Sequence, residues 1–232
     1  MHKQFPQVKT IITSGDKGNP FTREEFNRGE HELVHKSDRW GNADLFRFNK
    51  DGKSWVVKDF TPRSFFVRHT YGAWMTGVEL SALRLLSGLK GFPQESFRLD
   101  RFAFAYLFTP GKSIGRRNAV SSPAFFEELE VLVEKMHERG VAHLDIRAAK
   151  NILITDQGEP FILDFQSYAR LKTLPGFLRK LLVNIDRSAV YKHWERKFPD
   201  TIGHDRTIFL ERMNWQRRFW IFKGYLGLKK KK

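Results

Sequence analysis

The sequence predicts an α+β fold in which a strand-rich first half is followed by a helical second half. Three patterns carry this prediction: a β-hairpin signal within residues 45–57, an apolar stripe with helical spacing in residues 122–140, and a basic, helix-compatible stretch after residue 176. Strands that come first and helices that come later, without regular alternation, are typical of α+β proteins.

The first half contains four segments. Residues 1–28 mix Gly, Pro, Asn and charged residues, which predicts a loosely held arm. Asp51-Gly52 separates two β-prone runs and predicts a hairpin. Apolar residues three and four apart predict a helix over residues 68–86, and the short apolar run at 102–108 predicts a buried strand.

The second half begins with a helix that Ser122-Pro123 opens and Gly140 ends. A second hairpin is predicted next, because the turn residues 156–158 separate two apolar runs at 152–154 and 161–163. The helix is expected to bury one apolar stripe, formed by Phe126, Leu129, Leu132, Val133 and Met136.

The composition excludes several classes of protein. A chain of 232 residues, 41% hydrophobic and 14% aromatic, is long and apolar enough to bury a core, which argues against wholesale disorder. The absence of cysteine excludes disulfides, thiolate nucleophiles and cysteine-based zinc sites. The N-terminus has no apolar signal segment, and the longest apolar run is too short to span a bilayer. We therefore expect a cytoplasmic protein, free or peripheral on the inner face of the membrane.

The formal net charge of +15 is concentrated at one end of the chain. Residues 170–232 contain 17 Lys/Arg against 5 Asp/Glu, a net of +12. Aromatic and basic residues alternate irregularly in residues 206–223. Three interpretations remain open: contact with an anionic membrane surface, contact with nucleic acid, or ordinary packing with a solvated basic face.

The most informative stretch runs from residue 143 to residue 165. It contains His143-Leu144-Asp145, then Asn151, then Asp164-Phe165 after the predicted hairpin. The stretch resembles the catalytic and metal-binding loops of the protein-kinase superfamily. The phosphoryl transfer that this resemblance implies needs Mg²⁺, which prefers oxygen ligands such as Asn and Asp. It also needs a carboxylate that orients the attacking hydroxyl.

This resemblance assigns roles within the stretch. It implies that Asp145 is the catalytic base, and that Asn151 and Asp164 are ligands of Mg²⁺. Arg147 takes a position where protein kinases place a cation near the transferred phosphate. His143 resembles the loop histidine, whose role is structural.

The resemblance also implies partners in the first half. Residues 55–58 are similar to the kinase strand whose lysine binds the ATP phosphates, which makes Lys58 the candidate. Glu79 would pair with Lys58, and backbone groups near Tyr106 and Phe108 would receive adenine. Taken singly, Lys58 reads as a solvated strand charge and Glu79 as a surface residue on a helix.

The sequence departs from the kinase pattern at three places. Asn151 follows Asp145 by six residues where the family has five, Gln166 replaces the glycine of Asp-Phe-Gly, and Gly41 alone represents the glycine-rich loop. The sixth residue raises the question of whether Asn151 reaches the metal. Short, glycine-poor loops and a compact helical lobe without an evident Ala-Pro-Glu segment resemble the atypical RIO and bacterial lipopolysaccharide-kinase branches.

The resemblance implies a bilobal protein-kinase-like fold with an antiparallel-sheet N-lobe at 29–109 and a mainly helical C-lobe at 110–232, after the arm at 1–28. It implies an ATP- and Mg²⁺-dependent kinase that phosphorylates a hydroxyl. The acceptor would be a protein Ser/Thr or a sugar of a lipopolysaccharide precursor. The alternative is a pseudokinase that binds nucleotide or a partner without turnover.

Overall fold

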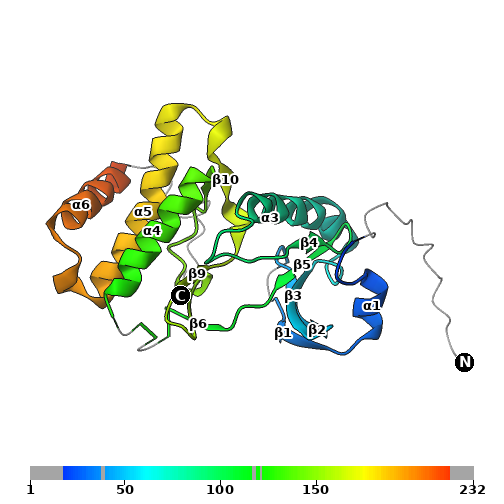
Figure 1. Cartoon of the computed structure of the whole chain (residues 1–232). Coiled ribbons are helices and arrows are strands. Elements are labelled where there is room, and N and C mark those ends of the chain that lie inside the picture. Colours follow the sequence, from blue (N-terminus) through cyan, green and yellow to red (C-terminus); the bar gives the residue numbers. More distant parts are fainter. Residues whose placement is uncertain (1–17, 38–39, 117–118, 121, 220–232) are drawn as a thin grey trace, which may run out of the picture. The chain divides into compact units, whose positions relative to one another are not determined.

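The structure is a computed structural model that describes residues 18–37, 40–116, 119–120 and 122–219 (Figure 1). The chain divides into two compact units. Unit 1 runs to Thr76 and includes Phe97–Tyr106, whereas unit 2 consists of Gly77–Ser96 and the residues from Leu107 onward. The predicted α+β class is confirmed, with strands concentrated in unit 1 and the long C-terminal helices in unit 2.

Unit 1 is built on a sheet with the strand order β1-β2-β3-β5-β4 within the described residues. Its strands are β1 (His31–His35), β2 (Asp44–Lys50), β3 (Lys53–Asp59), β4 (Phe97–Arg98) and β5 (Ala103–Leu107). β2 and β3 are antiparallel, and their ladder ends at the pair Lys50 and Lys53. Asp51 (φ 49°) and Gly52 (φ 73°) form the turn between them, with the two positive φ angles that a tight hairpin requires. The predicted hairpin is confirmed.

Helix α1 (Arg23–Arg28) corrects the prediction of a loose arm for the described end of that segment. Thr22 caps this helix: its hydroxyl accepts from the Glu25 N–H at 3.2 Å, and the Glu25 carboxylate accepts from the Thr22 N–H at 2.7 Å. Phe21 and Phe26 on either side of the cap are buried. Residues 1–17, the rest of the predicted arm, lie outside the described residues.

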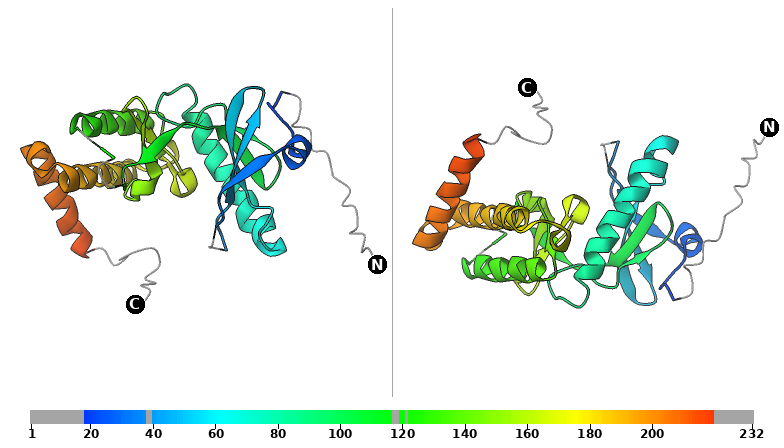
Figure 2. Two further views of the ribbon diagram at one scale, coloured as in Figure 1. Left: turned by 90° about the horizontal axis from the view of Figure 1, so that it is seen from below. Right: turned by 90° about the horizontal axis from the view of Figure 1, so that it is seen from above.

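One continuous helical stretch follows β3 and is drawn in cyan to teal in Figure 2. It consists of α2 (Phe65–Val67), a π-helix η1 (Arg68–Gly72) and α3 (Ala73–Leu85). A Cβ atom on Gly72 would lie 2.8 Å from the Cβ of Phe60, so glycine allows the helix to sit directly on the core of unit 1. The predicted helix at 68–86 is confirmed and begins three residues earlier.

The helices of unit 2 pack on one another in sequence order (Figures 1 and 2). They are α4 (Ala124–Glu138), α5 (Gly176–Lys197) and α6 (His204–Phe219). The predicted apolar stripe of α4 is entirely buried, and Phe126 in that stripe stacks on Trp194 with ring centroids 5.9 Å apart. Gly140 adopts φ 84° directly after α4, which confirms the predicted stop.

Short strands and turns connect these helices and carry the predicted catalytic segment. β6 (Gly111–Ser113), β8 (Ile152–Thr155) and β9 (Pro160–Ile162) form one sheet, and β7 (Val141–Ala142) pairs with β10 (Ala169–Arg170). The 3-10 helices are η2 (Ala149–Asn151), η3 (Phe165–Ser167), η4 (Leu171–Thr173) and η5 (Pro199–Thr201). The antiparallel β8–β9 ladder confirms the second predicted hairpin.

The basic aromatic segment at 206–223 is described only in part. Leu210 and Met213 on α6 are buried, while Ile208 and Trp215 are exposed. Residues 220–232, which include the terminal lysines, lie outside the described residues. Across the part of the chain that is described, none of the helices combines the length and apolar character that a membrane crossing requires.

Candidate active site

The loop from Asp145 to Asn151 is folded into two successive turns. The Ala148 N–H donates to the Asp145 carbonyl at 3.2 Å, and the Asn151 N–H donates to the Ala148 carbonyl at 2.8 Å. Because each turn returns the chain after three residues, the six-residue spacing still brings Asn151 back to Asp145. The Asn151 amide nitrogen donates to the Asp145 carbonyl at 3.0 Å and to its carboxylate at 2.9 Å.

The segment that leads to Asp164 is attached to the same loop. The Leu163 N–H donates to the Asn151 carbonyl at 2.8 Å, and His143 Nε2 lies 2.8 Å from the Leu163 carbonyl oxygen. Leu144 (φ 65°) and Asp164 (φ 68°) both have left-handed backbone conformations that cost free energy for residues other than glycine. The surrounding hydrogen bonds therefore hold both segments in strained conformations.

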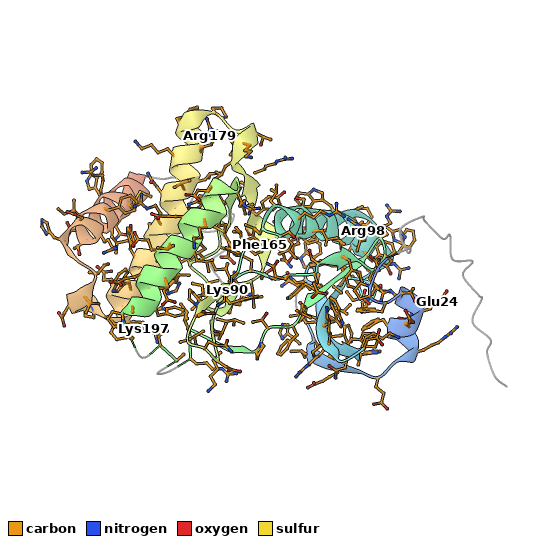
Figure 3. All side chains as sticks on the ribbon, in the orientation of Figure 1. Glu24, Lys90, Arg98, Phe165, Arg179 and Lys197 are labelled. Carbon is orange, nitrogen blue, oxygen red and sulfur yellow. The ribbon has the colours of Figure 1, made fainter. Side chains whose placement is uncertain are left out.

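His143 has the structural role that the resemblance implied. It is fully buried, and its ring centroid lies 4.7 Å from that of Phe165. Figure 3 labels Phe165 among the side chains of the molecule. The Asp145 N–H donates to His143 Nδ1 at 3.2 Å, so Nε2 carries the proton that is donated to the Leu163 carbonyl. A ring whose two nitrogens are both occupied by backbone groups positions the loop and is not available to exchange protons with a substrate.

Asp186 on α5 holds the start of the loop and was missed by the sequence analysis. Its side chain is completely buried, and its two oxygens accept from the N–H groups of His143 (2.7 Å) and Leu144 (2.8 Å). His137 Nε2 lies 3.1 Å from the same carboxylate. Nothing in the local sequence distinguishes this Asp from a surface residue of a helix, because its partners lie more than 40 residues away.

His193, seven residues or about two helical turns further along α5, contacts another part of the loop. Its Nε2 lies 3.0 Å from the Ile146 carbonyl, and its Nδ1 lies 3.0 Å from an Arg196 guanidinium nitrogen. Burial lowers the pKa of His193 below its usual value of 6.5, and the positive charges of Arg196 and Arg147 act in the same direction. The neutral ring therefore donates to the loop from Nε2 and accepts at Nδ1.

Asn151 and Asp164 have side-chain oxygens of the kind that Mg²⁺ takes as ligands. The Asn151 amide turns its nitrogen toward Asp145 and thus its oxygen away from that carboxylate. The Lys150 ammonium lies 4.0 Å from an Asp164 carboxylate oxygen, so a positive charge is already attracted to this group. The described residues contain no group of three or more His, Cys, Asp and Glu side chains suited to a metal. A pair of oxygen ligands is what Mg²⁺ uses when phosphates and water supply the rest.

The remaining predicted residues lie in both units. Lys58 is on β3 in unit 1, where it is only 6% exposed and its ammonium lies 5.9 Å from the centre of the Phe104 ring. Glu79 is on α3 in unit 2 and is 3% exposed. Neither residue is therefore a solvated surface charge, which removes the ordinary interpretation of each. Arg147, two residues after Asp145 in the sequence, is exposed.

The two residues proposed to flank adenine lie at the end of β5. Tyr106 is buried and belongs to unit 1, whereas Phe108 is half-buried and belongs to unit 2. The N–H of Leu107 between them donates to the Gln94 carbonyl at 3.0 Å. An adenine ring would therefore have to use other backbone groups of this segment.

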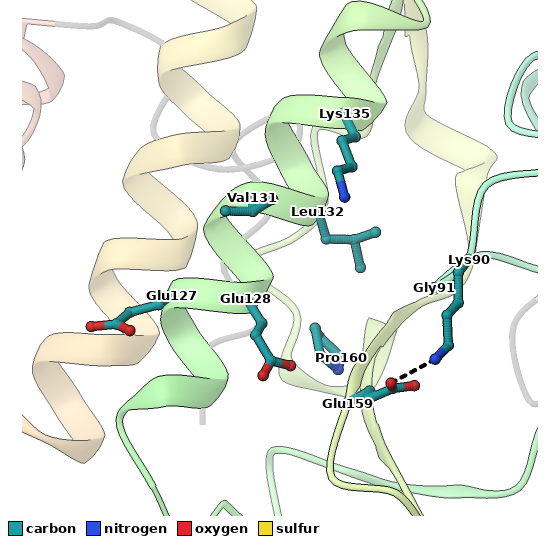
Figure 4. Close-up of a pocket in the computed structure, with 9 residues that line it drawn as sticks. All are labelled: Lys90, Gly91, Glu127, Glu128, Val131, Leu132, Lys135, Glu159 and Pro160. Atoms are coloured by element: carbon teal, nitrogen blue, oxygen red, sulfur yellow. Dashed lines mark hydrogen bonds and ion pairs between the residues drawn. The ribbon is translucent and has the colours of Figure 1, made fainter.

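A cavity of about 350 Å³ in unit 2 does not include any predicted site residue (Figure 4). Gly91, Leu132 and Pro160 form its apolar part, and the ion pair Lys90–Glu159, at 2.6 Å, lies at its edge. The chemistry predicted for the chain is therefore not located in this cavity.

The fold is similar to that of solved Rio2 kinase structures, which confirms the predicted protein-kinase-like α+β fold. The crystal structure of the Rio2 kinase from Chaetomium thermophilum matches 85% of this chain and 76% of that chain, with a TM-score of 0.54 and 14% identity. A Rio2 kinase–ADP/Mg²⁺–phosphoaspartate complex from the same organism matches 81% of this chain and 63% of that chain, with a TM-score of 0.55 and 17% identity. No protein-family model matches the sequence, and no curated protein matches it. The likeness to lipopolysaccharide kinases stays a prediction.

Proposed function

We propose that the chain is an ATP-dependent phosphotransferase that moves the γ-phosphoryl group to a hydroxyl. The observation that carries the proposal is the Asn151 amide bonded to the Asp145 carboxylate, in a loop whose backbone is also bonded to the segment before Asp164. Carboxylate and amide oxygens converging on one loop suit phosphoryl transfer, which depends on positioning and on charge neutralisation.

Each residue of this loop has a distinct task in the proposed reaction. Asp145 orients the acceptor hydroxyl and takes its proton, and the Asn151 N–H keeps the carboxylate in that orientation. Asn151 and Asp164 would hold Mg²⁺, which when bound neutralises phosphate charge. Arg147 is exposed and would contact the transferred phosphoryl group or the acceptor.

The nucleotide would be bound by residues of the strand-rich part. Lys58 would contact the ATP phosphates, Glu79 would orient Lys58, and the backbone near Tyr106 and Phe108 would receive adenine. Deep burial of Lys58 and Glu79 supports this assignment, because charged side chains are rarely buried without a specific partner. A Rio2 kinase structure with ADP and Mg²⁺ is additional support from the fold.

The acceptor belongs to one of two classes, a protein Ser/Thr or a sugar of a lipopolysaccharide precursor. The basic charge of residues 170–232 supports an acceptor at an anionic membrane surface, with nucleic acid as the rival partner. Transfer of labelled phosphate from ATP to protein and to purified glycolipid, in parallel reactions, distinguishes the two. Hydroxylamine treatment of the labelled chain shows whether the chain itself carries phosphate on an aspartate. Hydroxylamine releases phosphate from an aspartyl phosphate but not from the ester that a hydroxyl acceptor would form.

The first prediction tests Asp145 directly. Asp145→Asn keeps an oxygen for the Asn151 amide but removes the base, so kcat for transfer should fall by about 10²–10⁴-fold. Asp156→Asn, in the exposed turn between β8 and β9, is the matched control and should leave kcat unchanged. Initial rates with γ-labelled ATP measure both. Equal rates for wild type and Asp145→Asn would reject this mechanism, and no turnover by wild-type protein that still binds ATP would favour the pseudokinase.

A further inference from the structure

Large aromatic side chains are exposed along one stretch of unit 1. Phe65 is 70% exposed, Phe66 75%, Trp74 62% and Trp40 71%. Together with Tyr71, which contacts two of them, they are called here the aromatic ridge. Single exposed apolar residues are ordinary, but four large rings gathered within one unit indicate a surface that meets an apolar partner.

The helix that carries the ridge is oriented by its buried side. Gly72 lies against Phe60, and Met75 and Thr76 are buried beside it. Phe66 and Trp74 are eight residues apart, and both lie on the exposed side of this helical stretch. Because the close approach at Gly72 determines which face is buried, the exposed rings cannot turn inward without displacing the helix.

Contacts among the rings join three members of the ridge. Trp40 lies 5.9 Å from Tyr71, and Tyr71 lies 6.1 Å from Trp74, measured between ring centroids. A Cβ atom on Gly41 would lie 3.3 Å from the Tyr71 ring, so glycine at this position allows the segment around Trp40 to rest on Tyr71. Phe65 contacts His69 instead, with ring centroids 4.1 Å apart. These contacts position the rings before any partner arrives, which lowers the entropy cost of binding.

Basic residues lie beside the aromatic ridge. Residues 60–78 contain no Asp or Glu, and the Asp100 carboxylate accepts from the Phe102 N–H at 2.6 Å. The Arg68 guanidinium lies 5.8 Å from the Phe65 ring centre and 5.9 Å from that of Phe102, and the Arg101 guanidinium lies 5.8 Å from Phe102. Arginine side chains beside exposed apolar rings suit a partner whose surface is anionic and whose interior is apolar.

We propose that the aromatic ridge binds the surface of an anionic phospholipid membrane, with the rings among the headgroups and the arginines beside the phosphates. Aromatic side chains prefer this depth of the bilayer, and basic residues near it are attracted to anionic lipid. Phe65 and Phe66 are strongly exposed and have no polar side-chain atom, which favours lipid over base stacking or a hydrogen-bonded protein interface. The ridge belongs to unit 1, whereas the basic C-terminal segment belongs to unit 2.

Vesicle binding of the full chain tests the proposal. Wild-type protein should sediment with vesicles of phosphatidylglycerol and phosphatidylcholine, and only weakly with phosphatidylcholine alone. Phe65→Ser/Phe66→Ser should lower the partition coefficient by about tenfold or more. Phe177→Ser is the matched control, because Phe177 is 73% exposed but belongs to unit 2, and it should leave binding unchanged.

A probe at the ridge gives a second readout that does not depend on the amount bound. The chain has no cysteine, so Phe66→Cys and Phe177→Cys each carry a single environment-sensitive fluorophore. A blue shift on vesicles is expected for the label at position 66 and not for the label at 177. Circular dichroism of each variant shows that it is folded.

Three outcomes would overturn the proposal. Undiminished vesicle binding by Phe65→Ser/Phe66→Ser would mean that another surface, such as the basic C-terminal segment, binds lipid. Equal losses for this variant and for Phe177→Ser would mean that the ridge has no special role. Loss of binding to a single-stranded oligonucleotide, with vesicle binding intact, would assign the ridge to nucleic acid instead.

Discussion

The two compact units use buried charge in different ways. In unit 1, side chains pair with side chains: Arg23 contacts Asp59 and Asp100, each at 2.6 Å, and Arg63 pairs with Asp44. In unit 2, the buried carboxylate of Asp186 accepts from the backbone of the candidate catalytic loop, and His193 donates to the same loop.

The two sets of charges support the backbone over different distances along the chain. The Arg23 pairs connect α1 to the end of β3 and to the turn before β5, and their carboxylates accept from N–H groups two or three residues away, at Thr61, Phe102 and Ala103. Burial alone would lower the pKa of Arg23, but Asp59 and Asp100 raise it above its usual value. Asp186 instead satisfies two N–H groups of one loop, at a residue with φ 65° and at its neighbour. Stability and activity should therefore respond differently to changes in the two units.

The largest effect is expected when the support of the loop is removed. Asp186→Ala leaves two buried N–H groups without an acceptor, which should lower the free energy of unfolding by about 2–6 kcal/mol. Phosphotransfer should fall as well, because the loop that carries Asp145 loses its anchor. Urea unfolding and initial rates measure these two quantities.

Asp186→Asn is the milder variant to use if Asp186→Ala does not fold. It keeps one acceptor oxygen, so a folded protein with reduced kcat is expected. Asp200→Ala, at an exposed position in η5, is the control and should change neither quantity. Full activity of folded Asp186→Asn would show that the loop does not depend on this carboxylate.

A smaller effect is expected from breaking the ion pairs of unit 1. Arg23→Met keeps the aliphatic contact but leaves Asp59 buried without its guanidinium, so the free energy of unfolding should fall by about 2–3 kcal/mol. The Thr61 N–H, at 2.8 Å, still donates to Asp59 and limits the loss. kcat per folded molecule should not change, and a drop in kcat comparable to that of Asp186→Asn would remove the distinction between the units.

Lys50→Met provides the control for Arg23→Met. Lys50 on β2 pairs at 3.0 Å with Glu25 on α1, the helix that also carries Arg23. The two side chains of this pair are 32% and 44% exposed to solvent. Exposed ion pairs contribute little to stability, so the unfolding midpoint should stay close to that of wild type. Equal destabilisation by the two variants would mean that burial does not determine the contribution of these pairs.

The smallest expected effect is a pH dependence in unit 2. Burial lowers the pKa of His193, so below pH 6.5 the unfolded chain binds a proton that the folded chain does not. The stabilising contribution is complete above pH 6.5 and is lost as the pH falls toward the lowered pKa. His193→Gln keeps a donor for the Ile146 carbonyl and should reduce the loss of stability between pH 7.5 and pH 5.5.

Thermal unfolding at these two pH values measures the contribution of His193. His204→Gln is the matched control, because His204 is exposed at the start of α6. Its pH dependence should equal that of wild type. Identical pH dependence in wild type and His193→Gln would show that the folded protein takes up this proton as readily as the unfolded chain.

Much of the fold could be predicted because its signals are local. The Asp51-Gly52 turn, the buried stripe of α4 and the Gly140 stop depend only on neighbouring residues and on the helical or strand repeat. For the described residues 18–28, the prediction of a loose arm was wrong, because Arg23 joins unit 1 through residues 36 and 77 positions away. No periodic pattern in residues 1–28 records partners at such distances.

The residues of the candidate site stand in one short motif, whereas the side chains that hold this loop lie far away in the sequence. Two turns bring Asn151 back to Asp145 at a spacing of six residues. The catalytic and metal-binding roles of Asp145, Asn151 and Asp164 stay predictions. The roles of Lys58, Glu79, Arg147, Tyr106 and Phe108 stay predictions.

The sequence by itself therefore determined the elements and the motif, since turn chemistry, capping and apolar repeats act between residues close along the chain. Only the tertiary structure decided that Asp186 and His193 hold the loop, that α1 belongs to unit 1, and that the rings at Phe65, Phe66 and Trp74 stay exposed. The physical reason is that burial and long-range hydrogen bonds depend on which surfaces meet, and that is settled by packing of the whole chain.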